Sequence, residues 1–107
     1  MKRLALAALL SLSLGAFAQD VPDVAITIKD HKFSPDRIEV PAGKKVKLVV
    51  DNQDATPEEF ESHPLKVEKV IPGKSKATIF IGPLKAGEYK FVGEFNEKTA
   101  KGVIVAK

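Results

Sequence analysis

The segment TPEEFESHPL, residues 56–65, places three glutamates and a histidine around a single phenylalanine. In an extended chain successive side chains point to opposite faces, so Glu59, Glu61 and His63 would share one face while Phe60 points into the core. A proline follows His63 directly, which disfavours the helical conformation there and favours the extended arrangement. The alternative is a short helical turn after the first proline, which would bring Glu59 and His63 together at i, i+4. In both arrangements carboxylates and an imidazole converge.

Converging carboxylates have a chemical consequence. Like charges a few ångströms apart repel each other and raise the pKa of one carboxyl group unless a cation lies between them. Oxygen ligands combined with an imidazole suit iron, manganese or Cu(II), so one interpretation of this segment is a metal site. The other is a set of solvated charges on a loop, paired with lysines such as Lys66 in ion pairs worth less than about 1 kcal/mol each. The residues alone leave both interpretations open.

A second irregular segment, VGEFNEKTAKG at residues 92–102, repeats this pattern with an acid, an aromatic residue and an amide. It precedes the last predicted strand, and in a Greek-key sandwich such a loop can lie at the same end as an earlier crossover loop. Glu94 or Asn96 could then complete a site begun by Glu59 and Glu61. The alternative is an ordinary turn in which Phe95 is buried.

The remaining sequence predicts short strands separated by glycine and proline turns. Apolar residues alternate with polar ones in six segments, residues 24–29, 37–40, 45–51, 76–81, 88–92 and 102–107. Such spacing is typical of an all-β, antiparallel Greek-key β-sandwich, here of about seven strands. Tyr89 and the phenylalanines are predicted to lie in the core, and KKVK at residues 44–47 is predicted to be a solvated strand face. His31, in the turn KDHKFSP, is predicted to be a surface histidine.

The N-terminal residues are predicted to be a targeting segment and not part of the fold. A Lys-Arg start, an apolar run over residues 4–14 and a small-residue Ala-Phe-Ala motif indicate a signal peptide over residues 1–18, cleaved after Ala18. The apolar run is too short for a membrane span of about 20 residues. We therefore expect Sec export to the periplasm of a single domain, residues 19–107, without direct membrane insertion. Cleavage removes two of the basic residues, and the nearly neutral remainder predicts no nucleic-acid binding.

Cysteine and methionine usage limits the chemistry further. The chain has no cysteine, and its only methionine is Met1. Thiolate nucleophiles, disulfides and thiolate-bound metals are therefore excluded. No Gly-x-Ser-x-Gly or His-Glu-x-x-His motif is present either, so we predict no hydrolytic catalytic residues and no organic cofactor site.

Longer stretches of the sequence resemble a known family. FSPDRIEVPAGKKVKLVVDNQD is similar to the opening half of a cupredoxin. TPEEFES, GPLKAGEYKFVGEFN and TAKGVIVAK resemble the EfeO-type cupredoxin-like domain, and in particular the small periplasmic FtrB-like cupredoxins that accompany bacterial iron-uptake permeases. The resemblance covers residues 24–107.

The resemblance implies a cupredoxin-like sandwich that works with a periplasmic iron-binding protein and an inner-membrane iron permease. Its implied role is copper-linked oxidation or transfer of iron, with copper or iron as the bound metal. Whether the chain is an enzyme, such as a copper-dependent ferroxidase, or a carrier stays open, and so does a metal-free scaffold that docks a transport partner.

The family's metal-binding glutamates would fall on Glu59 and Glu61, with Glu68 nearby. Two departures limit this transfer. Because a type 1 copper centre needs a cysteine thiolate, blue-copper electron transfer is excluded. Related small cupredoxins tend to have an Asp-Phe-His run where this chain has Glu94-Phe95-Asn96, which makes His63 a candidate substitute for the missing imidazole. The predicted metal ligands are thus Glu59, Glu61, His63, Glu94, Glu68 and Asn96.

Overall fold

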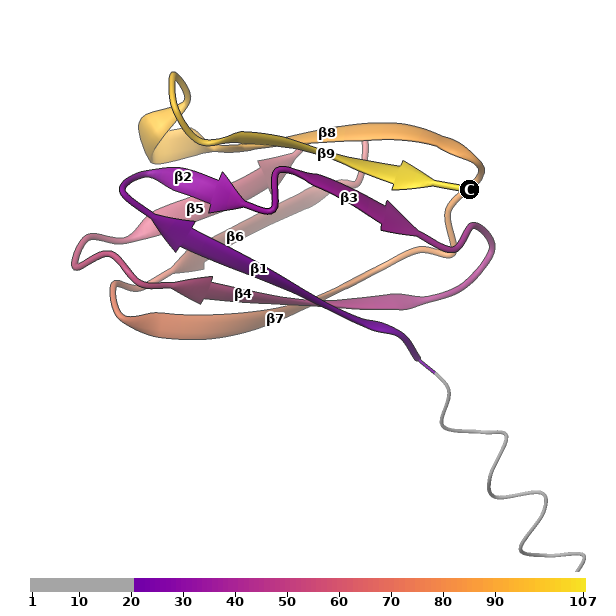
Figure 1. The fold of residues 1–107 in the computed structure, drawn as a ribbon, viewed down its shortest axis with the longest axis horizontal. Helices are drawn as coiled ribbons and strands as arrows, with labels where there is room; N and C mark the ends of the chain where they lie inside the picture. Colours follow the sequence, from indigo (N-terminus) through magenta and orange to yellow (C-terminus); the bar gives the residue numbers. More distant parts are fainter. Residues whose placement is uncertain (1–20) are drawn as a thin grey trace, which may run out of the picture.

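The computed structural model describes residues 21–107, and the predicted signal peptide over residues 1–18 lies outside the described residues. Within residues 21–107 the chain forms nine strands and one short 3-10 helix, η1 (Figure 1). In chain order these are β1 (Asp23–Lys29), β2 (Lys32–Ser34), β3 (Arg37–Val40), β4 (Val46–Asn52), β5 (Glu58–Ser62), β6 (Val67–Ile71), β7 (Ser75–Ile81), β8 (Gly87–Gly93), η1 (Glu94–Asn96) and β9 (Lys101–Ala106). In this part of the chain no helix is long and apolar enough to cross a membrane.

The strands form two sheets packed face to face. One is four-stranded with the order β2-β1-β4-β7, and the other is five-stranded with the order β3-β9-β8-β5-β6. Neighbouring strands are antiparallel except for β1 with β4 and β3 with β9, which pair in parallel. The predicted all-β sandwich is confirmed, with nine strands where about seven were expected and with two parallel pairings.

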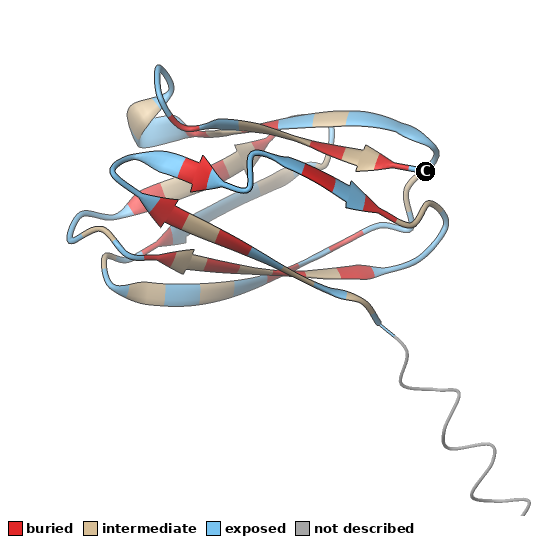
Figure 2. Cartoon of the chain, in the orientation of Figure 1, coloured by how far each residue is buried: buried red, intermediate tan, exposed pale blue. Residues whose placement is uncertain are grey.

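The core lies between the two sheets and follows the alternation of the sequence (Figure 2). In β4, Val46, Leu48 and Val50 are fully buried, whereas the residues between them face outward. Three phenylalanines meet at the centre: the rings of Phe60 and Phe91 stack with centroids 4.8 Å apart, and Phe33 packs edge-on against Phe91 at 4.9 Å. Edge-to-face and offset aromatic pairs add stability beyond the area they bury.

Three strands that the sequence did not predict have a common explanation. The strand β2 has only three residues. The strand β5 carries the polar residues Glu58 and Ser62 at two of its three inward positions, and β6 lies at the edge of its sheet with three consecutive exposed residues. None of the three therefore shows the apolar alternation on which a strand prediction depends.

The prediction that every phenylalanine lies in the core is wrong for two of them. Phe80 on β7 is 54 % exposed and Phe95 on η1 is 52 % exposed. Phe80 falls on the outward parity of its strand, between the buried Ile79 and Ile81, so the pleat turns its ring away from the core. Tyr89 is half-buried against the core, and its hydroxyl donates a hydrogen bond of 2.7 Å to the carbonyl of Lys85.

Candidate metal site

The acidic segment forms the strand β5, in which side chains alternate as the extended interpretation predicts. Phe60 is fully buried in the aromatic cluster, while Glu59 and Glu61 on either side of it are half-buried on the outer face of the five-stranded sheet. The helical-turn alternative is wrong. Because Phe60 is held by two other rings, it fixes the position of β5 and thereby the direction of both carboxylates.

Strand register brings further glutamates to the same face. Glu61 lies directly opposite Glu68 on β6 and opposite Val92 on β8, and Glu59 lies opposite Val70. Across an antiparallel pair, directly opposed Cβ atoms lie about 5 Å apart. Like charges at that distance destabilise a sheet, so the Glu61 and Glu68 pair is an unusual feature that requires an explanation.

Glu94 completes the cluster from the other side. It follows the last residue of β8 and is exposed at the start of η1. A hydrogen bond shared with Glu94 is the largest cause of a raised pKa at Glu59, and desolvation and the charges of Glu94, Glu68 and Glu61 add to it, so that the pKa of Glu59 is about 7. We call Glu59, Glu61, Glu68 and Glu94 the carboxylate cluster.

Glu61 is affected in the same direction. Desolvation is the largest cause of its raised pKa, followed by the charge of Glu94 and by hydrogen bonds shared with Glu94 and Glu68. A shared hydrogen bond between two carboxyl groups needs a proton, so near neutral pH the cluster holds at least part of a proton where a cation could otherwise lie.

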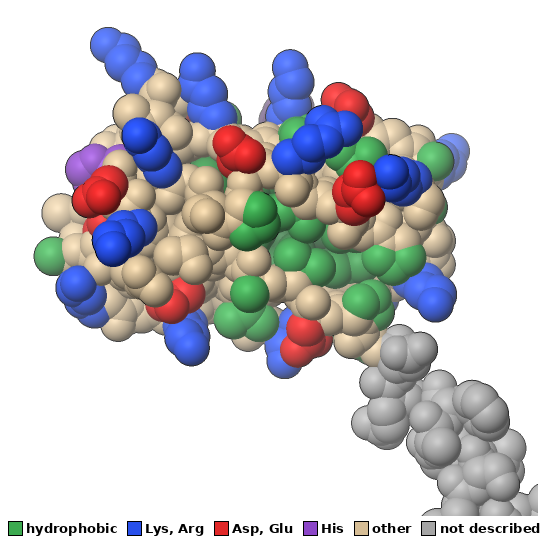
Figure 3. Space-filling view, in the orientation of Figure 1, with side chains coloured by type: hydrophobic (Ala, Val, Ile, Leu, Met, Phe, Trp, Pro, Cys, Tyr) green, Lys and Arg blue, Asp and Glu red, His purple; other side chains and the backbone are tan. Residues whose placement is uncertain are grey.

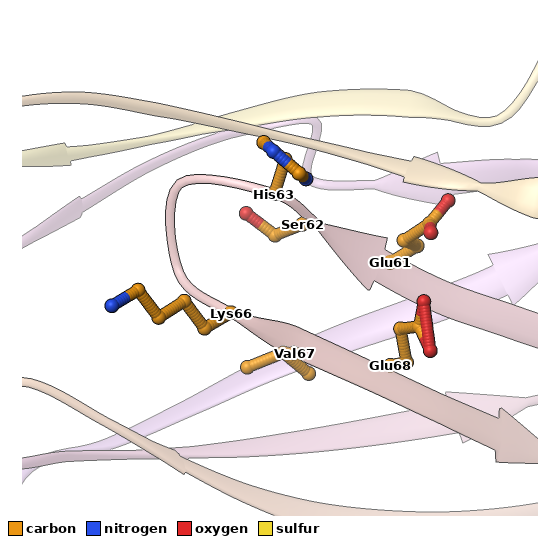
Figure 4. Close-up of a pocket in the computed structure, with 6 residues that line it drawn as sticks. All are labelled: Glu61, Ser62, His63, Lys66, Val67 and Glu68. Carbon is orange, nitrogen blue, oxygen red and sulfur yellow. The ribbon is translucent and has the colours of Figure 1, made fainter.

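Figure 4 shows Glu61 and Glu68 side by side on the neighbouring strands β5 and β6. His63 is exposed and lies past the end of β5, where the chain begins its turn toward β6, and Lys66 points away from both carboxylates. The cluster is thus not neutralised by Lys66. The interpretation of these glutamates as solvated loop charges paired with lysines therefore does not hold for Lys66. His63 lies on the rim of the cluster rather than within it.

A fifth glutamate, Glu58, lies beneath the cluster and is 1 % exposed. Its carboxylate accepts hydrogen bonds from the backbone N–H of Glu59 at 3.0 Å and of Phe95 at 2.9 Å. It also accepts one from Nδ2 of Asn96 at 2.7 Å. Glu58 therefore ties η1 to β5, and the two irregular segments, whose meeting the sequence left open, lie together at one end of the sandwich.

Asn96 has a different place from the one predicted. Its amide nitrogen donates to the buried Glu58, so its side chain points beneath the sheet and away from the outer carboxylate cluster. Of the two candidates in the second segment, Glu94 joins the cluster and Asn96 does not.

His31 is exposed in the β1–β2 turn, as predicted for a surface histidine. Asp54 accepts hydrogen bonds from the backbone N–H groups of Asp30 and His31, and these bonds are the main reason why the pKa of Asp54 is lowered. Thr99 donates a hydrogen bond of 2.6 Å to the carbonyl of His31. The turn is therefore held against both irregular segments.

Sequence reasoning missed two buried polar residues that shape this end of the molecule. The side chain of Asn52 donates to the carbonyls of Thr56, Ile71 and Pro72, and it also accepts from the N–H of Asp54. Glu58 shares the inward parity of Phe60, and that parity is the signal from which its burial could have been predicted. Asn52 likewise shares the inward parity of Leu48 and Val50 on β4.

As it stands, the cluster is not a finished metal site. Within residues 21–107 no three carboxylate or imidazole side chains are already arranged around one point as a bound metal ion requires. The cluster brings carboxylates together from β5, β6 and η1, and their crowding raises the pKa of Glu59 and of Glu61. Binding a cation would need the loss of a proton and small rotations of flexible glutamate side chains.

Comparisons with known proteins agree with this architecture. The family model of the cupredoxin-like domain matches residues 2–106. An uncharacterized protein of Rickettsia prowazekii is 45 % identical over 86 residues, which cover 80 % of this chain and 69 % of that protein.

Solved structures with similar folds include a copper binding protein in its apo form, with a TM-score of 0.72 at 17 % identity over 83 % of this chain and 91 % of the other. Auracyanin A from Chloroflexus aurantiacus, a "blue" copper protein, gives 0.68 at 13 % identity, with coverage of 80 % and 99 %. The metal binding domain of the Cu(I) exporting ATPase CopA from Streptococcus pneumoniae gives 0.68 at 14 % identity, with coverage of 81 % and 94 %. The sandwich and its neighbours thus define a cupredoxin-type fold, and the chain belongs to the cupredoxin-like domain family.

Proposed function

We propose that this protein binds one transition-metal ion on the outer face of its five-stranded sheet. The observation that carries the proposal is the carboxylate cluster, in which the pKa of Glu59 is raised to about 7 by a hydrogen bond shared with Glu94 and by three neighbouring negative charges. Such crowding is unfavourable in an empty site and is relieved when a cation replaces the shared proton. Glu59, Glu61, Glu68 and Glu94 would hold the ion, and the exposed His63 could reach it from the rim.

The donor set determines which metals fit. A type 1 copper centre does not fit this chain, because its thiolate ligand has no counterpart in a sequence without cysteine. Carboxylates with an optional imidazole suit Fe(II), Fe(III), Mn(II) or Cu(II). The copper proteins among the structural neighbours support copper, and the resemblance to FtrB-like cupredoxins supports copper or iron in the service of iron uptake.

The wider context of the proposal follows the resemblance. The protein would be exported to the periplasm and would hand its metal to, or oxidise iron for, a periplasmic iron-binding protein and an inner-membrane iron permease. A carrier and a ferroxidase make different predictions. A ferroxidase would transfer electrons from Fe(II) to O₂, so oxygen consumption on adding Fe(II) to the copper-loaded protein would identify one.

A metal-free docking module is the second candidate function. It is favoured by the absence, in residues 21–107, of three ligands already arranged for a metal. The carboxylate cluster would then attract a basic surface of a transport partner, and the complex would weaken as salt screens the charges.

Calorimetric titration of the mature domain, residues 19–107, tests the proposal. Cu(II) is added in air, and Fe(II) and Mn(II) are added without oxygen. We expect saturable binding of one ion, and loss of that binding in the double variant Glu59→Gln/Glu61→Gln.

The matched control for this titration is Glu39→Gln/Glu88→Gln. It removes two exposed carboxylates of the same sheet that are paired with Lys107 and Arg37. Binding that is unchanged in the Glu59/Glu61 variant, or lost equally in the control, would contradict the site assignment. The absence of any binding would favour the docking module.

A further inference from the structure

The outer face of the four-stranded sheet has a character of its own. Sequence alone predicts a solvated strand face for KKVK, and the structure adds lysines from the neighbouring strands to the same face. Register aligns Lys47 of β4 with Phe80 of β7, and it aligns Asp51 with Lys76. Lys29 at the end of β1 and Lys74 before β7 line one shallow hollow with Asp51. We call this surface the lysine face; its charged residues are Lys29, Lys45, Lys47, Lys74, Lys76, Asp23 and Asp51.

The middle of the lysine face is flat and uncharged. Ala25, Val49 and Thr78 lie in one row across β1, β4 and β7, all with short side chains that point outward. Phe80 lies in the next row, opposite Lys47; it is 54 % exposed, with the ammonium group of Lys45 4.9 Å above the centre of its ring. Phe80 is thus a single exposed aromatic side chain among lysines, beside a neutral centre.

Few of these lysines are neutralised within the molecule. Among the described residues, Lys47 is the only lysine of the face with a carboxylate at ion-pair distance, and its Nζ lies 4.0 Å from Asp23. On the five-stranded sheet, by contrast, Arg37 and Lys107 are paired with glutamates. The lysine face thus carries five lysines against two aspartates, and the carboxylate cluster lies on the other sheet.

We propose that the lysine face docks on an anionic lipid surface. Charge complementarity is the first reason, because each lysine near an anionic bilayer adds roughly a fivefold factor to binding. The composition of the face is the second. Protein interfaces are depleted in lysine and depend on tyrosine, tryptophan and arginine, none of which lies on this face. Clustered lysines are instead attracted to anionic lipid headgroups, and Phe80 adds one exposed apolar side chain among them.

Docking in this way orients the molecule. The carboxylate cluster lies on the outer face of the opposite sheet, so it would point away from the bilayer and toward solution. Figure 3 shows the domain from the edge between its sheets, with lysine and arginine side chains projecting around its margin. An anionic surface repels the cluster and attracts the lysine face, so both charges favour the same orientation. The docking does not depend on metal binding, and it can be tested without metal.

Vesicle binding tests the proposal. Residues 21–107 contain both sheets and the core between them, so the domain from residue 19 onward is used, with chelator present. We expect it to sediment with vesicles of phosphatidylcholine mixed with phosphatidylglycerol, not with pure phosphatidylcholine, and to be released as salt is added.

Two variants with equal change in net charge locate the interaction. Lys45→Gln/Lys47→Gln/Lys76→Gln should weaken binding on the order of 100-fold. Lys90→Gln/Lys98→Gln/Lys101→Gln removes three exposed lysines of β8, β9 and the loop between them and should change it little. Equal weakening in both variants would overturn the assignment to the lysine face.

Fluorescence gives an independent readout because the chain has no tryptophan. The emission of Phe80→Trp should shift to shorter wavelength on anionic vesicles, whereas Phe95→Trp, at an equally exposed position outside the lysine face, should not shift. Failure of the wild-type domain to bind anionic vesicles would overturn the proposal, and retention on poly-glutamate without vesicle binding would assign the face to an acidic protein instead.

Discussion

Replacing Glu58 by alanine is expected to release η1 from β5 and to disperse the carboxylate cluster. The buried Glu58 carboxylate accepts one hydrogen bond from its neighbour Glu59 and two from η1, at 2.9 Å from the N–H of Phe95 and at 2.7 Å from Nδ2 of Asn96. The two bonds to η1 are the hydrogen bonds that hold Glu94 at its position beside Glu59. Without these two hydrogen bonds, η1 keeps only its backbone hydrogen bonds to the loop that precedes β9.

The magnitude follows from these bonds. A hydrogen bond to a charged group contributes about 1.5–3 kcal/mol, and a buried donor left without its partner costs a similar amount. Asn96 is half-buried and Phe95 is exposed, so water can accept hydrogen bonds from both donors and replace part of the energy of the lost bonds to Glu58. We therefore expect Glu58→Ala to lower the free energy of unfolding by about 2–4 kcal/mol, a large part of the roughly 5–15 kcal/mol that is typical of a domain.

Urea denaturation of wild type, Glu58→Ala and Glu58→Gln measures this effect. The glutamine variant keeps one acceptor oxygen for Phe95, and Asn96 can rotate its amide to accept from the new NH₂ group, so its loss should be only about 1 kcal/mol. In the alanine variant Glu94 moves away, and the pKa of Glu59, followed by NMR, should fall from about 7 toward its usual value of 4.5.

Two results would refute this reasoning about Glu58. One is an alanine variant whose unfolding free energy lies within about 0.5 kcal/mol of wild type, the range of an ordinary surface substitution. The other is an unchanged pKa of Glu59 in a variant that is clearly destabilised, which would mean that Glu94 keeps its position without the bonds from Glu58.

Two further predictions concern pH and packing. The pKa of Glu59 is raised on folding, so its contribution to stability is fully present below pH 4.5 and is lost as the pH rises through about 7. The midpoint of urea denaturation should therefore fall over that pH range, and it should fall less in Glu59→Gln. A midpoint that rises with pH instead would contradict the shared proton. A methyl group at Gly102 would overlap the ring of Phe91 and lie 2.9 Å from the carbonyl of Asp36, so Gly102→Ala should cost about 1–3 kcal/mol in thermal unfolding, whereas Ala25→Ser on the outer sheet face should cost little.

Most of the fold could be predicted from apolar alternation. In residues 45–51 each inward position carries valine or leucine, and the structure forms β4 over nearly the same range. The strand β5 could not be found in this way, because two of its three inward positions carry the polar residues Glu58 and Ser62. Its strand character is set by the aromatic cluster and by pairing with β6 and β8, which are contacts distant in sequence.

The positions of the candidate site residues were predictable only where they depend on alternation along a single strand. Alternation around Phe60 correctly placed Glu59 and Glu61 on one face, since parity along a strand is a local property. The pairing of Glu61 with Glu68 depends on the register of a turn that composition does not fix. Asn96 was predicted at the cluster and instead serves Glu58, because a 3-10 turn after β8 sends consecutive side chains in different directions.

The shared proton also explains how four glutamates can be placed together in a small domain that is stabilised by packing alone. Fully ionised, the cluster would set Glu61 directly opposite Glu68 across β5 and β6, and Glu59 and Glu94 would repel each other as like charges. Holding a proton between Glu59 and Glu94 removes one negative charge and replaces a repulsion with a hydrogen bond. At the proposed metal site an ion would do the same more strongly, so proton and metal would compete for one place. The raised pKa of Glu59 predicts the pH at which this competition ends: above about pH 7 the proton is lost, and a cation would bind without displacing it.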